Sequence, residues 1–187
     1  MIATSIAQAT GEAARTTRKI LLALLFLAVF SITASAQVQS FTKEGIEYVL
    51  DLPSQSWRAV TRMDVHEHLE FTNGANTNDG YLRLRKKVVA SGTSTEALFS
   101  EDEKWKLRRL PGYVACSGGK GAAFNGNLKG ASYSYEFDKG GMNMDGRIYY
   151  LQLDNRTFYV LHFTVASSKL ASLREEMDSI AHSFRLK

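Results

Sequence analysis

Apolar and polar residues alternate along much of the chain, a pattern that predicts β-strands with one buried face. The first alternating stretch ends at Pro53, and Trp57 follows soon after it. Residues 72–79 separate the next two stretches and are rich in Asn, Gly and Asp, which tolerate the backbone angles of a turn. These two stretches are therefore expected to form a hairpin. The predicted longer strands occupy residues 46–51, 63–71, 80–89, 128–138, 144–154 and 156–166.

The pattern is less regular in the middle of the chain. Tyr113 to Cys116 are expected to form a short strand, and Gly118 to Asn127 a loop, because glycine and asparagine mark the latter segment. Asp154-Asn155 predicts a tight turn between the last two strands.

Two helices are expected to cover the sheet. Thr93-Ser-Thr-Glu96 matches a capping box, so a helix is predicted from there until Pro111-Gly112 stops it. The last helix begins with a cap at Ser167 or Ser168, and its apolar stripe consists of Leu170, Leu173, Met177, Ile180 and Phe184. Because the strand at 156–166 is apolar on both faces, both faces need a cover. The sequence predicts an α+β domain, with an antiparallel β-sheet sandwiched between helices in an α/β/α arrangement.

The N-terminal segment has the organisation of a secretory signal peptide. Basic residues end at Lys19, an apolar run follows from Ile20 to Phe30, and Ala34-Ser-Ala36 supplies the small residues that signal peptidase requires. The apolar run is too short to span a membrane. We therefore expect residues 1–36 to be a signal peptide cleaved near Ala36-Gln37, residues 37–187 to form a single domain without a membrane span, and the mature protein to be periplasmic or secreted.

Charge and cysteine content narrow the classes of function. The chain has a net charge of +4, but the leader carries three basic residues and one acidic residue, which leaves the mature domain at +2. So small a charge gives no electrostatic basis for binding nucleic acid. Cys116 is the only cysteine and cannot form an intrachain disulfide, so a buried apolar role is expected for it.

Several segments together resemble the PsbP-like superfamily. They are Gly45-Ile-Glu-Tyr-Val-Leu-Asp-Leu-Pro53 followed by Trp57, then Gly146-Arg-Ile-Tyr-Tyr150, Arg156-Thr-Phe-Tyr-Val-Leu-His-Phe163, and a final helix that closes on Ser183-Phe184-Arg185. The resemblance implies an α/β/α sandwich that acts by binding a partner, in a family whose bacterial members include exported proteins of unassigned role. No functional residue of the family matches a position of this chain.

The known enzyme signatures are not matched, and no catalytic residue, metal ligand or cofactor site is predicted. Gly118-Gly-Lys-Gly121 lacks the upstream glycine and the following Ser or Thr of a P-loop, and Ser134 stands where a nucleophile elbow needs glycine. Glu101-Asp-Glu103 is interpreted as a solvated helix turn, because consecutive helical side chains diverge. His162 is interpreted as a hydrogen-bonded core residue, and His182 as a group at a helix C-terminus.

The stretch Met63-Asp-Val-His-Glu-His-Leu-Glu-Phe71 raises the question of a metal site. Its Asp64, His66, His68 and Glu70 would share one strand face. If polar faces match across the predicted hairpin, Glu70 lies opposite Tyr81, and the remaining pairs are His68 with Arg83, His66 with Arg85 and Asp64 with Lys87. Guanidinium groups so close would repel a divalent cation, which disfavours the metal site. Two interpretations of this polar face remain: a solvated charged surface and a surface that docks a partner.

The function expected from the sequence is that of an exported, non-enzymatic binding or adaptor protein. Its partner would be a protein or an anionic ligand of the cell envelope, and its predicted contact residues are Tyr81, Arg83, Arg85, Lys87, His66 and His68. The alternatives are a structural subunit of an envelope complex and a small periplasmic hydrolase or metal-dependent enzyme. The enzyme would assemble its site from distant residues, with His66, His68, His162 and Cys116 as candidates.

Overall fold

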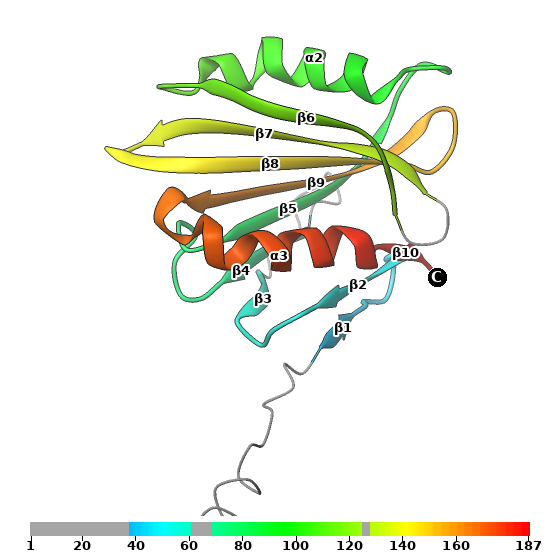
Figure 1. Ribbon diagram of the computed structural model, residues 1–187. Coiled ribbons are helices and arrows are strands. Elements are labelled where there is room, and N and C mark those ends of the chain that lie inside the picture. The colour runs from blue at the N-terminus through cyan, green and yellow to red at the C-terminus, as the bar shows by residue number, and fades with distance from the viewer. Residues whose placement is uncertain (1–37, 61–68, 125–127) are drawn as a thin grey trace, which may run out of the picture. The chain divides into compact units, whose positions relative to one another are not determined.

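The computed structural model describes residues 38–60, 69–124 and 128–187. These residues belong to one compact unit, Gln37–Lys187. It contains a large seven-stranded sheet of order β3-β4-β5-β9-β8-β7-β6, whose neighbouring strands are antiparallel. The strands are β3 (Trp57–Val60), β4 (Leu69–Asn73), β5 (Tyr81–Val88), β6 (Val114–Ala123), β7 (Lys129–Lys139), β8 (Met142–Gln152) and β9 (Thr157–Ala166). Figure 1 shows this sheet between two helices.

A smaller three-stranded sheet holds the two ends of the domain together. It has the order β1-β2-β10, with β1 at Gln39–Phe41, β2 at Tyr48–Leu52 and β10 at Arg185–Leu186. The Arg185 guanidinium donates two hydrogen bonds to the Asp51 carboxylate, at 2.8 and 3.0 Å. The C-terminus is thereby fixed beside the first predicted strand.

The helices cover opposite faces of the large sheet. Helix α3 (Ser167–Ser183) packs against β2, β8 and β9, and its Leu173, Met177 and Ile180 enter a core with Phe71, Leu82, Tyr149, Leu161 and Phe163. Helix α2 (Thr95–Trp105), followed by the short 3-10 helix η1 (Leu107–Arg109), covers the other face. Its core contains Leu98, Leu107, Tyr133, Tyr135, Ile148, Tyr150 and Val160. The predicted α+β class and the sandwich of helix, sheet and helix are confirmed.

The middle of the chain differs from prediction. Residues 114–123 form one long strand, β6, where a short strand and a loop were expected. Its pairing with β7 shifts register twice, between Ala115 and Ser117 and between Gly119 and Ala122. Glycine is used here for close approach, because a Cβ atom on Gly118 would lie 2.8 Å from the Tyr133 ring. A glycine needed for packing was therefore mistaken for a glycine needed for a turn.

Both predicted helix caps are also corrected. The side chain of Ser94, one residue after the predicted cap, accepts a hydrogen bond from the Ala97 backbone N–H at 3.2 Å. The hydroxyl of Thr93 instead donates to the carbonyl of Ala90 at 2.7 Å. Helix α3 is preceded by Ala166 and has no side-chain cap, so the serine cap predicted there is wrong.

The hairpin of β4 and β5 forms with the expected faces but with a different register. Glu70 lies opposite Arg83, and Thr72 lies opposite Tyr81, so the strands are displaced by two residues from the predicted pairing. Only a shift by an even number keeps Leu69 and Phe71 on the buried face, where they pair with Leu84 and Leu82. The alternation of apolar and polar residues therefore determined which face of the hairpin is buried, while the turn determined which residues pair.

Candidate binding site

The predicted contact face is only partly open. Arg83 is 40% exposed and lies 4.0 Å from the Glu70 carboxylate, a distance at the limit of an ion pair. Asp64, His66 and His68 lie outside the described residues, so their part of the predicted docking face stays a prediction, and so does the metal alternative. Among the residues that the structure describes, no group of three or more His, Cys, Asp and Glu side chains could hold a metal ion.

Arg85 and Lys87 form ion pairs with helix α2. Arg85 Nη2 donates to the buried Asp102 carboxylate at 3.0 Å, and Lys87 Nζ donates to Glu101 at 2.8 Å. Asp102 is only 3% exposed and also accepts bonds from Lys106 Nζ and the Tyr150 hydroxyl, at 2.5 and 2.8 Å. Asp102 therefore does not belong to a solvated helix turn.

The ionisation of Asp102 depends on this cluster. Burial acts to raise the pKa of Asp102, but hydrogen bonds from Lys106 and Tyr150 and the charge of Arg85 outweigh it, so the pKa lies below its ordinary value. Asp102 consequently remains a carboxylate, and much of the positive charge predicted for the docking face is neutralised within the protein.

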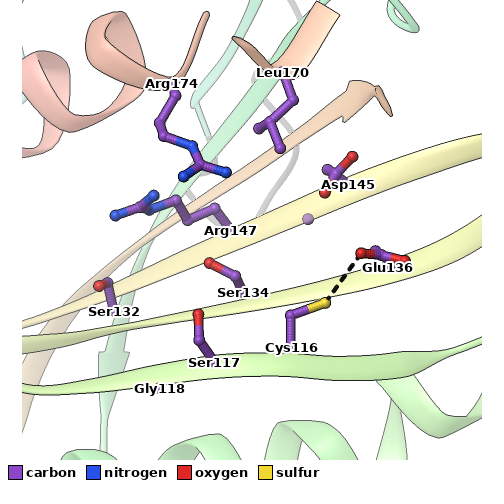
Figure 2. A pocket seen from close by; sticks show the side chains of 11 residues that line it. Cys116, Ser117, Gly118, Ser132, Ser134, Glu136, Asp145, Arg147, Leu170 and Arg174 are labelled. Atoms are coloured by element: carbon purple, nitrogen blue, oxygen red, sulfur yellow. Dashed lines mark hydrogen bonds between the residues drawn. The ribbon is translucent and has the colours of Figure 1, made fainter. Parts of the chain in front are cut away.

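A separate polar pocket of about 400 Å³ opens on the face of the sheet that carries α3. Helix α3 packs on β8 and β9, and the pocket lies beside it over β6, β7 and β8. Figure 2 shows side chains from these three strands and from α3 around it. Its lining consists of Cys116, Ser117, Gly118, Ser132, Ser134, Glu136, Asp145, Gly146, Arg147, Leu170 and Arg174.

One end of the pocket is positive. Arg147 is positioned by an ion pair of 2.9 Å to Asp178 of α3, and its guanidinium lies 5.3 Å from the centre of the Tyr149 ring. Its Nε atom is buried and has no hydrogen-bond partner among the described residues. Arg174, one turn from Asp178 on α3, is exposed and forms no ion pair with any described residue. The Arg174 guanidinium thus has donors available for a ligand, and the Arg147 guanidinium, whose side chain is 21% exposed, adds positive charge beside it.

Small side chains form the floor of the pocket. Ser132 and Ser134 are half-buried, and they alternate on β7 with the buried Ala131, Tyr133 and Tyr135, which face α2. Neither hydroxyl is hydrogen-bonded to another group in the described part of the protein. Ser134 is the strand partner of Arg147, so a hydroxyl and a guanidinium point from neighbouring strands into one space (Figure 2). Such groups commonly bind anions.

The other end of the pocket is acidic and includes the cysteine. Cys116 is exposed, so the predicted buried role is wrong; the register shift in β6 places its side chain in the pocket. Its thiol donates to Glu136 Oε1 at 3.4 Å. Partial burial, followed by the nearby carboxylate of Glu136, raises the pKa of the thiol. The sulfur is therefore less nucleophilic than an ordinary cysteine at neutral pH.

The candidate residues of the enzyme alternative are not brought together where the structure describes them. His162 lies on the α2 face of the sheet, where its Nε2 shares a hydrogen bond of 2.6 Å with the Tyr135 hydroxyl, while Cys116 lies on the α3 face. The prediction of a hydrogen-bonded core histidine is confirmed. His182 occupies the last turn of α3, as predicted, and its Nδ1 lies 2.7 Å from the Asp178 carbonyl oxygen.

The environment of His162 predicts a dependence of stability on pH. Burial, followed by the charge of Arg85, lowers the pKa of His162 from 6.5 to about 4. The unfolded chain then binds a proton below about pH 6.5 that the folded protein does not bind until about pH 4, so acid destabilises the fold. Between pH 7 and pH 5 we expect His162 to account for a loss of about 2 kcal/mol in the free energy of unfolding.

This contribution can be isolated in the variant His162→Gln, by measuring urea denaturation at both pH values. The side chain of Gln keeps a hydrogen-bonding group near Tyr135 but does not titrate, so the loss between pH 7 and pH 5 should shrink by about 2 kcal/mol. An unchanged loss in the variant would contradict the assignment.

Comparison with known proteins agrees with this architecture. Searches of protein-family models and of curated proteins found no match. Among solved structures, the cyanobacterial PsbP of Synechocystis sp. PCC 6803 matches with a TM-score of 0.56 and 9% identity, over 84% of this chain and 96% of its own. The fold is PsbP-like.

Two other structures extend the PsbP-like comparison. The Ran-binding protein Mog1p of Saccharomyces cerevisiae matches with a TM-score of 0.57 and 10% identity, over 81% of this chain and 96% of its own. LpqN of Mycobacterium tuberculosis, which is involved in cell envelope biogenesis, matches with a TM-score of 0.53 and 14% identity, over 81% and 91% of the two chains. At such identities the likeness establishes the PsbP-like fold alone. The function has to be inferred from the candidate site. Neither helix within the described ranges is long and apolar enough to cross a membrane.

The pocket of this PsbP-like domain was not predicted from the sequence. A usable signal was present on β7, where Ser132, Ser134 and Glu136 form a continuous polar face inside an otherwise aromatic strand. Arg147 and Arg174 carried no such signal, because they meet only when α3 folds back over the sheet.

Proposed function

We propose that this protein is an exported, non-enzymatic binding protein that acts in the periplasm or outside the cell after cleavage near Ala36-Gln37. Its ligand is anionic, either a small molecule or an acidic group of a protein partner in the cell envelope. The N-terminal pattern of charge and apolar residues supports export. The PsbP-like fold is compatible with this proposal, since similar structures include the Ran-binding protein Mog1p.

The pocket between α3 and β6–β8 carries the proposal. It combines two arginines with two serine hydroxyls that have no hydrogen-bond partner in the described residues, inside about 400 Å³. Guanidinium and hydroxyl donors that line a hollow commonly bind a carboxylate or phosphate. Burial, followed by the carboxylates of Glu136 and Asp145, raises the pKa of the Cys116 thiol, so its described surroundings do not activate it. Binding is thus better supported than covalent catalysis.

Titration with inorganic phosphate tests the proposal. The purified protein should bind phosphate saturably, as followed by amide chemical shifts of β7 and β8 in solution NMR. Arg174→Glu should weaken this binding about tenfold or more, because a charge-assisted hydrogen bond is replaced by repulsion. Arg174 is exposed, so the variant should fold normally, and Arg58→Glu on the exposed side of β3 is a matched control. Equal phosphate binding by Arg174→Glu and the unmodified protein would refute the assignment.

The face predicted from the sequence is retained as a second proposed contact surface, for a protein partner. Its proposed residues are Tyr81, Arg83, Arg85, Lys87, His66 and His68, of which Tyr81 also lines a pocket with Glu70, Leu110 and Phe137. In-cell crosslinking of a variant in which the charge of Arg83 alone is reversed is the suitable test of this contact surface. Reversal at Arg85 would break the Asp102 cluster and report on stability instead.

A further inference from the structure

The polar pocket has charges of opposite sign at its two ends. Figure 2 shows the guanidinium groups of Arg147 and Arg174 at one end and the carboxylates of Glu136 and Asp145 at the other, with Ser134 between them. A ligand that carried only negative charge would satisfy one end and be repelled by the other. The pocket therefore selects for a second, positive group on the ligand.

The acidic end has unsatisfied charge of its own. Glu136 and Asp145 are direct partners across β7 and β8, and both side chains line the pocket. Like charges in directly opposite positions destabilise a sheet. Neither carboxylate forms an ion pair with any residue in the described ranges, where the Glu136 carboxylate accepts one hydrogen bond, from the Cys116 thiol. A ligand ammonium between the two carboxylates would relieve this repulsion and donate up to three hydrogen bonds.

The distance between the two ends indicates the size of the ligand. Asp145 and Arg147 are two residues apart on β8, which separates their Cα atoms by roughly 7 Å. Figure 2 shows the Arg147 side chain extending away from Asp145, so their charged groups are not closer than the two Cα atoms. An extended peptide spans at most about 3.5 Å per residue, so the charged ends of a dipeptide or tripeptide are about 7 to 10 Å apart. A single α-amino acid is too short to reach both ends.

We propose that the pocket binds a short peptide of two or three residues with free termini. Its carboxylate contacts Arg147, Arg174 and the Ser134 hydroxyl, and its ammonium lies between Glu136 and Asp145. Leu170 of α3 lines the same space and supplies an apolar contact for a small side chain. This inference rests on the proposed binding function and narrows the class of its ligand, because the anionic group bound by the arginines is then the carboxylate of a peptide that also carries an ammonium.

Isothermal titration calorimetry with four probes tests the inference. The probes are trialanine, N-acetyl-trialanine, trialanine amide and inorganic phosphate, and the protein is the purified product of the full chain. Trialanine should bind saturably, and blocking either terminus should weaken binding about tenfold or more, because each block removes one charge-assisted contact. Phosphate should bind more weakly than trialanine.

Two variants separate the ends of the pocket. Arg174→Ala should weaken trialanine binding about tenfold or more, whereas the amide should bind the variant and the unmodified protein alike. In the double variant Glu136→Gln, Asp145→Asn, trialanine and its N-acetyl form should bind equally. The double variant removes a repulsion between partly exposed groups and should fold at least as well as the unmodified protein. Arg58→Ala and Glu44→Gln, both exposed and outside the pocket lining, are the matched controls.

The outcomes distinguish the inference from the function on which it rests. If N-acetyl-trialanine binds as tightly as trialanine, the peptide inference is wrong, and the pocket is a plain anion site. If neither trialanine nor phosphate binds saturably, the inference and the proposed binding function both fail.

Discussion

Replacement of Asp102 by Ala is expected to lower the free energy of unfolding by about 3–5 kcal/mol. The side chain is 3% exposed and accepts hydrogen bonds from Arg85, Lys106 and the Tyr150 hydroxyl. Without the carboxylate, the Tyr150 hydroxyl and the Arg85 charge would lose their partner beneath α2, and buried groups without partners are costly. A loss of this size is a large part of the 5–15 kcal/mol that stabilises a typical domain.

Urea denaturation at pH 7 measures this loss. Glu101→Ala is the matched control, because Glu101 is the neighbouring acid on α2, is exposed, and pairs with Lys87; such a surface pair contributes about 1 kcal/mol or less. A small effect of Asp102→Ala, similar to that of Glu101→Ala, would mean that Arg85 and Tyr150 find other partners and that the cluster does not hold α2 on the sheet.

Replacement of Trp57 by Ala is expected to destabilise the domain by about 3–5 kcal/mol. Trp57 is 2% exposed, its ring meets Phe163 edge-on at 6.0 Å between ring centres, and its Nε1 donates to Glu176 of α3 at 2.7 Å. Because Trp57 is the first residue of β3, an edge strand, this side chain joins the edge of the sheet to the helix that covers it. The substitution removes both the packing and the hydrogen bond.

Two further substitutions separate these contributions in the same denaturation experiment. Trp57→Phe keeps an aromatic ring but loses the donor to Glu176, so its cost should be smaller, about 2 kcal/mol. Arg58→Ala, at the exposed next position of β3, should change the free energy of unfolding by about 0.5 kcal/mol or less. A cost for Trp57→Ala as small as that for Arg58→Ala would show that β3 contributes little to the core.

The sequence predicted the parts of the fold that depend on local periodicity. The strands at 128–138, 144–154 and 156–166 follow from spacing alone, and the structure places them within two residues. Two helices on opposite faces were also predicted, but α2 ends at Trp105 and is followed by the short 3-10 helix η1, where one helix up to Pro111 was expected. Two features depended on distant partners and were predicted incorrectly. The register of the first hairpin is displaced by two residues, and β6 extends through glycines that pack against Tyr133.

The charged residues show more clearly that features which depend on distant partners could not be predicted from the sequence. Asp102 stands between two other acids on a helix, which is the pattern of a solvated surface, yet it is buried because β5 brings Arg85 and β8 brings Tyr150 to it. Sequence reasoning treated Arg85 as a free cation for the same reason. A charge pattern identifies charged residues but not their partners, and the partners here are 17 and 48 positions away.

The two register shifts in β6 have a consequence for how the domain behaves at high concentration. β6 is an edge of the large sheet, and an edge strand exposes backbone donors and acceptors that can recruit a strand from another molecule. Irregularities of this kind bend an edge and break the regular spacing of those groups. In β6 the longest run of uninterrupted register is three residues, Ser117–Gly119. A second molecule would thus find no regular ladder to extend, and the edge is protected against open-ended polymerisation.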